Sequence, residues 1–199
     1  IYQISLTLEK NIEEKELSNL LNNLELPLIE VLFEMEQNGI SVDLNKLNNL
    51  LNEFEKSAKE YEKEAFKLVG HEFNMASPKQ LQTVLFDERK LPKTKKTKTG
   101  FTTDADALED LFTKTKDPVL SSILKWRDIT KLKQVVASLI PLADKNARIH
   151  STFNQTITST GRLSSTEPNM QNIPISTEQG KRIRDCFVSD KNYECILTA

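Results

Sequence analysis

The sequence is poor in the residues that most often build metal and redox sites. It contains two cysteines and two histidines, and Cys186 and Cys195 lack the spacing to His71 or His150 that a zinc site requires. We therefore expect two reduced thiols, as in a cytoplasmic protein, rather than a disulfide or a zinc centre. No metal site is expected within the chain.

Long apolar runs and targeting signals are also missing. No hydrophobic stretch is long enough to cross a bilayer. The N-terminus has no basic region followed by an apolar block and a cleavage site. These absences argue against a membrane protein and a secreted protein. The chain begins at Ile1 rather than at a methionine, from which we expect a fragment of a longer protein.

The composition is otherwise ordinary, with 38% hydrophobic and 28% charged residues. A chain of 199 residues can bury a core in one domain or in parts of two. The charge, however, is unevenly spread. Residues 1–70 carry 14 acidic and 7 basic residues, whereas residues 71–199 carry 15 acidic and 20 basic residues. A basic second half favours a polyanionic partner, although this signal is weak by itself.

Apolar residues recur every three or four positions along the first three-quarters of the chain, which predicts helices. Ser77-Pro78 and the aspartates 43, 104 and 117 are typical of helix starts, and Asn38-Gly39 is typical of a helix end. The expected helices cover residues 1–24 in one or two pieces, 27–38, 43–70, a short segment from 78, a segment from about 104, and 117–139.

The pattern changes after residue 146. The β-branched residues of "ARIHSTFNQTITSTGRLSS" predict strands, and we interpret "GKRIRDCFVS" and "YECILTA" as two more short strands. The expected fold class is therefore mainly α with a small antiparallel β portion (α+β). In this interpretation the C-terminal part begins a sheet that the chain does not complete.

Lysine and threonine alternate in "KTKKTK", residues 93–98, and no acidic residue lies between Arg89 and Lys98. Two interpretations stay open. The segment is either a solvated surface loop or a tip that grips phosphates, because Lys and Thr donate hydrogen bonds to phosphate oxygens without reading sequence. Lys131 and Lys133 on the last long helix form a second basic set with the same two interpretations.

Residues 159–180, "STGRLSSTEPNMQNIPISTEQG", contain no His or Cys, so no familiar nucleophile, metal cluster or proton relay can be built from them. They do contain donors suited to the minor groove, where purine N3 and pyrimidine O2 accept hydrogen bonds in every base pair. A capping loop would explain the Ser, Glu and Pro of this stretch but not its donor set, which is Arg162, Asn169, Gln171 and Asn172.

"TGRLSSTEPNMQNIPI", followed by "GKRIRDCFV", resembles the thumb-to-palm junction of family A DNA polymerases, the DNA polymerase I type. The likeness continues in order through "LELPLIEVLFEMEQNGISVD", "FNMASPKQLQTVLF", "LPKTKKTKTGFTTDADALEDL", "KWRDITKLK" and "RIHSTFNQTITSTGRLSS". The resemblance implies the end of a 3′–5′ exonuclease-like domain in residues 1–26, a thumb in residues 27–145 and the start of a palm in residues 146–199.

The resemblance also implies roles for the polar residues. Arg162 would reach the minor groove at the primer-terminal base pair and check its geometry. The implied DNA-binding residues are Arg162, Asn169, Gln171, Asn172, Thr160, Ser164, Lys131, Lys133, Lys95, Lys96 and Lys98. The implied partners are primer–template DNA and, in the complete enzyme, dNTP. The implied protein is a monomer of the bacterial cytoplasm, associated with the nucleoid and without membrane contact.

The same resemblance places the chemistry outside this chain. In the family, the first catalytic aspartate follows a strand like "ECILTA" in an Asp-Tyr-Ser-Gln motif, and this sequence ends at Ala199, one residue short. We expect Mg²⁺ to serve two-metal nucleotidyl transfer in the parent enzyme, with no cofactor bound and no catalysis by the chain alone. The sequence departs from the family at Ser176, where Arg is frequent, and at Gln134-Val135-Val136, where Ser or Thr often follows "KLK".

Three functions are therefore considered. The first is a fragment of a DNA-directed DNA polymerase that acts in replication and repair. The second is a non-catalytic, sequence-neutral clamp on duplex DNA, or one half of a split polymerase. The third, a single-subunit RNA polymerase, is disfavoured because "TGRLSS" and "PNMQNIP" resemble the DNA enzymes.

Overall fold

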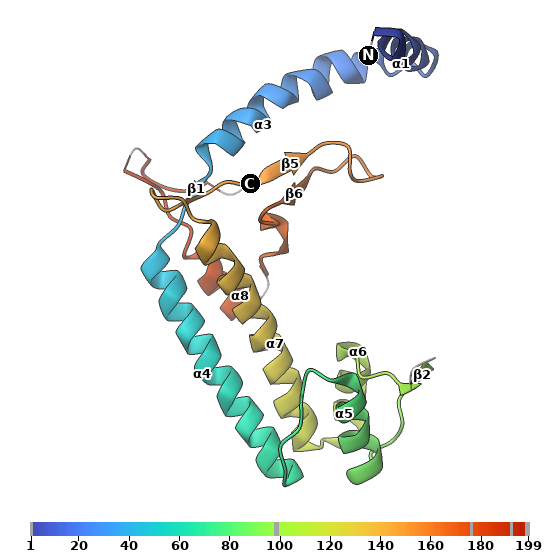
Figure 1. The fold of residues 1–199 in the computed structure, drawn as a ribbon, viewed down its shortest axis with the longest axis vertical. Coiled ribbons are helices and arrows are strands. Elements are labelled where there is room, and N and C mark those ends of the chain that lie inside the picture. The colour runs from blue at the N-terminus through green and yellow to red at the C-terminus, as the bar shows by residue number, and fades with distance from the viewer. Residues whose placement is uncertain (1, 98–99, 176, 192, 198–199) are drawn as a thin grey trace. The chain divides into compact units, whose positions relative to one another are not determined.

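The computed structural model describes residues 2–97, 100–175, 177–191 and 193–197. The chain divides into two compact units, which we name the terminal unit (residues 1–44 and 138–199) and the middle unit (residues 45–137). Helices dominate, and the described residues also form three two-stranded antiparallel sheets (Figure 1). The expected α+β class is confirmed.

Two long helices frame the middle unit. They run alongside each other in Figure 1, and the Nζ of Lys125 on one lies 5.9 Å from the ring centroid of Tyr61 on the other. The elements in chain order are α4 (Leu44–Val69), α5 (Pro78–Gln82), the π-helix η2 (Thr83–Glu88), the hairpin of β2 (Lys96–Thr97) and β3 (Gly100–Phe101), α6 (Ala105–Thr115) and α7 (Pro118–Leu139).

Two of these helices begin at the predicted caps. Ser77 Oγ accepts a hydrogen bond from the amide of Gln80 at the start of α5 (3.4 Å), and Asp104 Oδ1 accepts one from the amide of Ala107 at the start of α6 (2.8 Å). Each cap satisfies an amide that has no partner inside its own helix.

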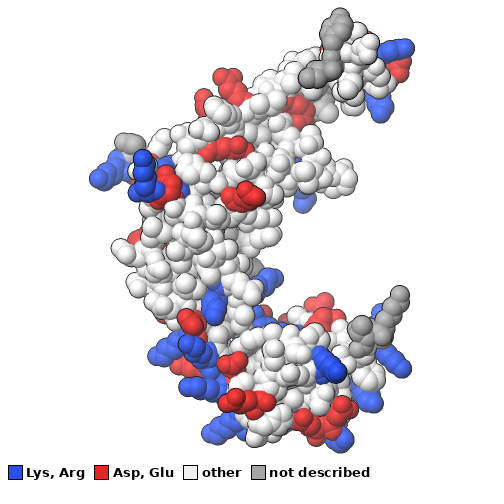
Figure 2. All heavy atoms as spheres, viewed as in Figure 1, with Lys and Arg blue, Asp and Glu red and all other residues white. Residues whose placement is uncertain are grey.

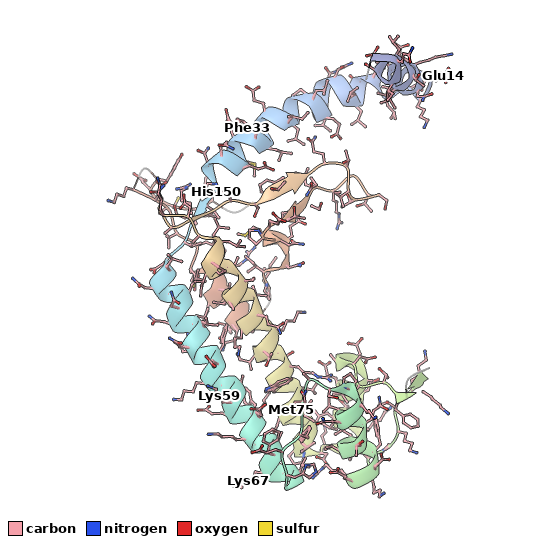
Figure 3. The ribbon with its side chains drawn as sticks, viewed as in Figure 1. Glu14, Phe33, Lys59, Lys67, Met75 and His150 are labelled. Atoms are coloured by element: carbon pink, nitrogen blue, oxygen red, sulfur yellow. The ribbon has the colours of Figure 1, made fainter. Side chains whose placement is uncertain are left out.

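The core of the middle unit collects apolar side chains from the helices and from the segment after α4. Met75, labelled in Figure 3, is 1% exposed, and the ring of Phe73 packs edge-to-face on Phe66 with centroids 5.5 Å apart. The fully buried members are Ala65, Leu81, Leu85, Leu108, Val119, Leu120 and Ile123. Burial of this surface is the main stabilising contribution to the unit.

Arg89 ties together the facing ends of the two long helices. Its Nη1 donates to the carbonyl of Leu68 near the end of α4 (2.9 Å), where carbonyls lack a helical partner. Its Nη2 and Nε donate to the carboxylate of Asp117 (2.8 and 3.2 Å), which also accepts from the amide of Val119 at the start of α7 (2.9 Å). A cation at one helix's C-terminus and an anion at the other's N-terminus are both favoured by the helix dipoles.

The terminal unit combines helices with short strands. β1 pairs with β4, placing Ile40 opposite Ile149, and β5 pairs with β6, placing Phe153 opposite Ser165. In chain order its elements are α1 (Tyr2–Glu14), α2 (Ser18–Leu20), the π-helix η1 (Leu21–Glu25), α3 (Leu26–Asn38), β1 (Ile40–Ser41), the 3₁₀-helix η3 (Ile140–Leu142), β4 (Arg148–Ile149), β5 (Thr152–Asn154), β6 (Ser164–Thr166), the 3₁₀-helix η4 (Met170–Asn172) and α8 (Glu178–Arg184).

Gly39 makes the turn from α3 into β1, as the sequence predicts. Its φ is +59°, and a Cβ there would lie 2.6 Å from the carbonyl oxygen of Ile149, so only glycine fits. Arg148 secures the same turn, because its Nε donates to the carbonyl of Asn38 (2.5 Å) and its Nη1 pairs with Asp190 (2.5 Å).

Two strand predictions are wrong. The stretch "GKRIRDCFVS" contains helix α8, whose Thr177 cap accepts from the amide of Gly180 (3.0 Å) and whose last turn is basic. Both features favour a helix, and Phe187 contributes only a single bridge to Val42. In "YECILTA", the described residues 193–197 form neither strand nor helix.

The predicted helix start at Pro27 agrees with α3 (Leu26–Asn38), which has this proline in its first turn. The π-helix η1 leads directly into α3, so the chain is helical without interruption from Ser18 to Asn38. A break in the helical chain lies near Glu16, whose φ is +56°.

The helices α1 to α3 leave many large apolar side chains uncovered. Phe33, labelled in Figure 3, is 60% exposed. The others include Ile4, Leu6, Leu8, Leu24, Ile29, Val31 and Met35. In the part of the chain that is described, no helix is both long and apolar enough to cross a bilayer. Several large exposed apolar side chains on neighbouring helices are typical of a surface that contacts other parts of a protein or a partner.

Arg89→Met should destabilise the middle unit by about 2–3 kcal/mol. The variant leaves the Asp117 carboxylate half-buried without its cation and the Leu68 carbonyl without a donor. Chemical denaturation followed by circular dichroism measures this loss. Lys79→Met, at an exposed position of α5, is the matched control and should change stability by less than about 0.5 kcal/mol. Equal stability of the two variants would contradict the role given to Arg89.

Candidate nucleic-acid interface

The polar stretch predicted to bind DNA folds as a braced loop in the terminal unit. It runs from Thr158 through β6 to η4 (Figure 1). Its centre is Ser165, which is 1% exposed. The Ser165 hydroxyl accepts from the amide of Met170 (3.0 Å) and donates to Asn169 Oδ1 (3.3 Å). The loop is therefore held by hydrogen bonds from its own side chains.

Arg162 is exposed on this loop, and two side chains hold the main chain at its carbonyl and at the next one. The carbonyl of Arg162 accepts from the hydroxyl of Thr158 (2.5 Å), and the next carbonyl, of Leu163, accepts from Nε2 of Gln171 (3.0 Å). Within the described part of the chain, no residue hydrogen-bonds or pairs with the guanidinium of Arg162. The backbone is thus fixed while the charged group stays available to a ligand.

The other predicted residues of the loop divide into two groups. Asn169 Oδ1 caps η4 by accepting from the amide of Gln171 (3.0 Å), and the side chain of Gln171 is bonded to Leu163, so both amides help to build the loop. Asn172 and Thr160 are exposed, and no side-chain bond to a described residue is present at either. Ser164 Oγ is buried and has no hydrogen-bond partner among the described residues.

The predicted lysines belong to the middle unit. Lys131 is exposed and Lys133 is half-buried on α7, and because they are two residues apart they point in different directions. Lys95 and Lys96 are exposed at the hairpin. Lys98 lies outside the described residues.

The two arms of the hairpin around Lys95 and Lys96 are held to each other. The hydroxyl of Thr94 donates to the carbonyl of Thr102 (2.6 Å), and the Nζ of Lys93 lies 5.0 Å from the ring centroid of Phe101. Gly100 has φ +128°, a conformation that side chains rarely adopt. The lysine segment therefore includes the paired strand β2. This strand is compatible both with a solvated surface loop and with a tip that grips phosphates.

Arg127 connects α7 to the start of α6. It is one helical turn before Lys131 and so shares its face, but its Nη1 donates to the carbonyl of Thr103. Burial lowers the pKa of Arg127, and the nearby carboxylate of Asp104 opposes that shift. The pKa of Asp104 is in turn lowered, first by the hydrogen bond from the Thr102 hydroxyl (2.6 Å) and then by the amide of Ala107.

Charges of both signs share the surface of the middle unit. On the face in Figure 2, Lys and Arg are interspersed with Asp and Glu rather than gathered into one patch. The described residues also contain no group of three His, Cys, Asp or Glu side chains that could hold a metal ion. On this face, therefore, the described residues offer a ligand individual donors.

Sequence reasoning missed two residues that shape these sites. Thr158 lies four residues before Arg162 in a run of hydroxyls, and Arg127 lies four residues before Lys131 on α7. The short spacing of Thr158 and Arg162 is a sequence signal for the bond between them. Arg127 and Thr103 are 24 residues apart, so only the folded structure shows their bond.

Comparison with known proteins gives consistent matches. The sequence model of DNA polymerase family A matches residues 44–199. The chain is 53% identical over 180 residues to DNA polymerase I of Mycobacterium tuberculosis (strain ATCC 25618 / H37Rv), covering 90% of this chain and 20% of that protein. It is 42% identical over 194 residues to DNA polymerase I of Bacillus subtilis (strain 168), covering 96% of this chain and 22% of that protein.

A solved structure is also similar. It is the POL domain of Pol1 from M. smegmatis in complex with a DNA primer-template and dNTP, with a TM-score of 0.89 and 52% sequence identity. The match covers 94% of this chain and 33% of that one. The chain thus spans about a fifth of the length of the curated relatives described above.

The Asp104 cap predicts a measurable pKa. NMR titration should place the Asp104 pKa below the ordinary aspartate value of about 3.9, because the Thr102 hydroxyl and the Ala107 amide bond the charged form. The stability that this cap contributes is present above the unfolded pKa and is lost as the pH falls through the lower folded pKa. Thr102→Val should raise the pKa, whereas Thr113→Val at an exposed position of α6 should leave it unchanged. An ordinary value in the wild type would refute the cap.

Proposed function

Because the chain belongs to DNA polymerase family A, we propose that it is the DNA-holding part of a DNA-directed DNA polymerase. It would grip primer–template DNA through the minor groove and through backbone phosphates while dNTP is added to the primer. The observation that carries this proposal is the likeness to the M. smegmatis POL domain, which was solved with a DNA primer-template and dNTP. At 52% identity over 94% of the chain, the likeness extends to the sequence as well as the fold.

Arg162 is the residue we assign to the base pair. Its guanidinium is exposed and free of described partners, and it projects from a backbone held by Thr158 and Gln171. A donor fixed in this way can test whether the minor-groove acceptors are in their Watson–Crick positions, which a mispair displaces. Asn172 and Thr160, which are also exposed, would contact the DNA beside it.

The other residues that the sequence predicts to bind DNA are assigned roles different from that of Arg162. We propose that Asn169 and Gln171 act mainly on the loop, because their side chains already bond main-chain atoms. Ser164 would need to turn its buried hydroxyl outward to reach DNA. Lys131, with the lysines of the hairpin (95, 96 and 98) and Lys133, would hold phosphates and position the duplex without reading its sequence.

We assign the chemical step to residues outside this chain. The described residues do not provide a metal-binding group, so no metal-dependent step is assigned to them. In the whole enzyme, Mg²⁺ would activate the primer 3′-OH and stabilise the leaving pyrophosphate. We propose that the first aspartate that binds Mg²⁺ follows Ala199.

The surface of α1 to α3 supports a role within a larger protein. Its exposed apolar side chains, such as Phe33 and Ile29, would be covered by neighbouring parts of the polymerase. We retain the proposed division into an exonuclease-like end (residues 1–26), a thumb (27–145) and the start of a palm (146–199). A monomeric protein of the bacterial cytoplasm, associated with the nucleoid, also remains a prediction.

The chain by itself should bind primer–template duplex in the micromolar range at low salt. Because the affinity comes from phosphate contacts, the logarithm of the binding constant should fall linearly with the logarithm of the salt concentration. Lys131→Gln should reduce that slope by about 1. Lys63→Gln, at an exposed position of α4, is the matched control and should leave it unchanged. Fluorescence anisotropy provides the measurement, and absent binding or a flat slope would contradict phosphate gripping.

Arg162→Ala should slow nucleotide incorporation far more than it weakens DNA binding. In the full-length polymerase that carries this chain, we expect a loss on the order of 100-fold in the incorporation rate. The contact matters most in the transition state, so the Kd for primer–template should change little. Lys145→Ala, at an exposed position of the terminal unit, is the control. Equal losses in rate and affinity would make Arg162 a residue that only anchors DNA and would contradict a check on base-pair geometry.

A further inference from the structure

We propose that Thr158 is a positioning residue for Arg162. Its hydroxyl holds the carbonyl of Arg162 and thereby sets the direction in which the guanidinium meets the base pair. This inference rests on the proposed function of Arg162 and extends it to a residue that would not itself contact DNA.

The first argument is the closure of the loop. Thr158 Oγ1 lies 2.5 Å from the carbonyl oxygen of Arg162 and joins two residues four positions apart. Between them is Gly161, with φ +73° and no atom within 4 Å of the position where a Cβ would be. A glycine in open space adds freedom to the backbone. The Thr158 bond removes that freedom just before Arg162.

The second argument is that the C-terminal side of Arg162 is already held. Gln171 Nε2 bonds the carbonyl of Leu163 (3.0 Å), and Ser164 pairs with Asn154 in the β5–β6 ladder. The segment before Arg162 is held by the Thr158 hydroxyl, which closes residues 158–162 by bonding the Arg162 carbonyl. Without it, Arg162 would be attached to a rigid strand at one end and a flexible glycine turn at the other.

The third argument is that Thr158 differs from the hydroxyl residues around it. Thr156, Ser159 and Thr160 are exposed, whereas Thr158 is half-buried and its hydroxyl is bonded to the main chain. Its β-branch restricts rotation about χ1, so little freedom is lost when the hydroxyl donates. Thr156 therefore serves as a matched control of the same residue type, two positions away.

The test uses the full-length polymerase that carries this chain, with single-turnover incorporation and primer–template Kd as separate readouts. Thr158→Val keeps the shape and removes the donor, and we expect the incorporation rate to fall on the order of 5- to 10-fold, as for the loss of one hydrogen bond. The Kd should change by less than about twofold, because no DNA contact is removed. Thr158→Ser should restore the rate, and Thr156→Val should match the wild type.

A double variant separates this inference from the proposed function. Once Arg162→Ala has removed the guanidinium, Thr158→Val should cause no further loss, because the brace then has nothing to position. If Arg162→Ala slows incorporation but Thr158→Val does not, or if the two losses multiply, the inference is overturned while the proposed function stands. If Arg162→Ala leaves incorporation unchanged, both are overturned. Should Thr158→Val fail to fold, the Thr158→Ala and Thr158→Ser pair gives the same comparison.

Discussion

Side chains of the loop from Thr158 to Asn172 satisfy the hydrogen-bonding groups of its own main chain. A segment without a long strand ladder must find such partners elsewhere, because an unpaired buried amide or carbonyl is costly. Ser165 and Gln171 supply them at Met170 and Leu163. Because Ser165 and Gln171 make these bonds, the loop does not use the guanidinium of Arg162 to hold its main chain. That guanidinium therefore stays available to bind a ligand.

Side chains also bond main-chain groups elsewhere in each unit. Arg89 joins the end of α4 to Asp117 at the start of α7, and Arg148 closes the turn after α3. In each case a guanidinium meets carbonyl oxygens near the C-terminal end of a helix, where the dipole favours a cation. The guanidinium groups of Arg89 and Arg148 are thus bonded within the fold, whereas that of Arg162 has no partner among the described residues.

The sequence was a good guide where one residue determines a boundary. Ser77, Asp104 and Gly39 mark helix ends because their caps and turns depend only on neighbours in the chain. It failed at α8, where the apolar residues suited a strand but Thr177 caps a helix. It could not separate Gln171 from Asn172, because an amide suits a minor groove and a loop carbonyl equally well. Only the folded position of Leu163 shows which amide is already bonded.

The most direct test of a prebuilt loop is a pair of crystal structures of the polymerase that carries this chain, without DNA and with primer–template. The account predicts that the bonds from Thr158 to the Arg162 carbonyl and from Gln171 to the Leu163 carbonyl are present in both structures. It also predicts that the Arg162 guanidinium reaches the minor groove of the primer-terminal pair in the complex. A loop that breaks both bonds on binding DNA, or an Arg162 that points away from the groove, would contradict it.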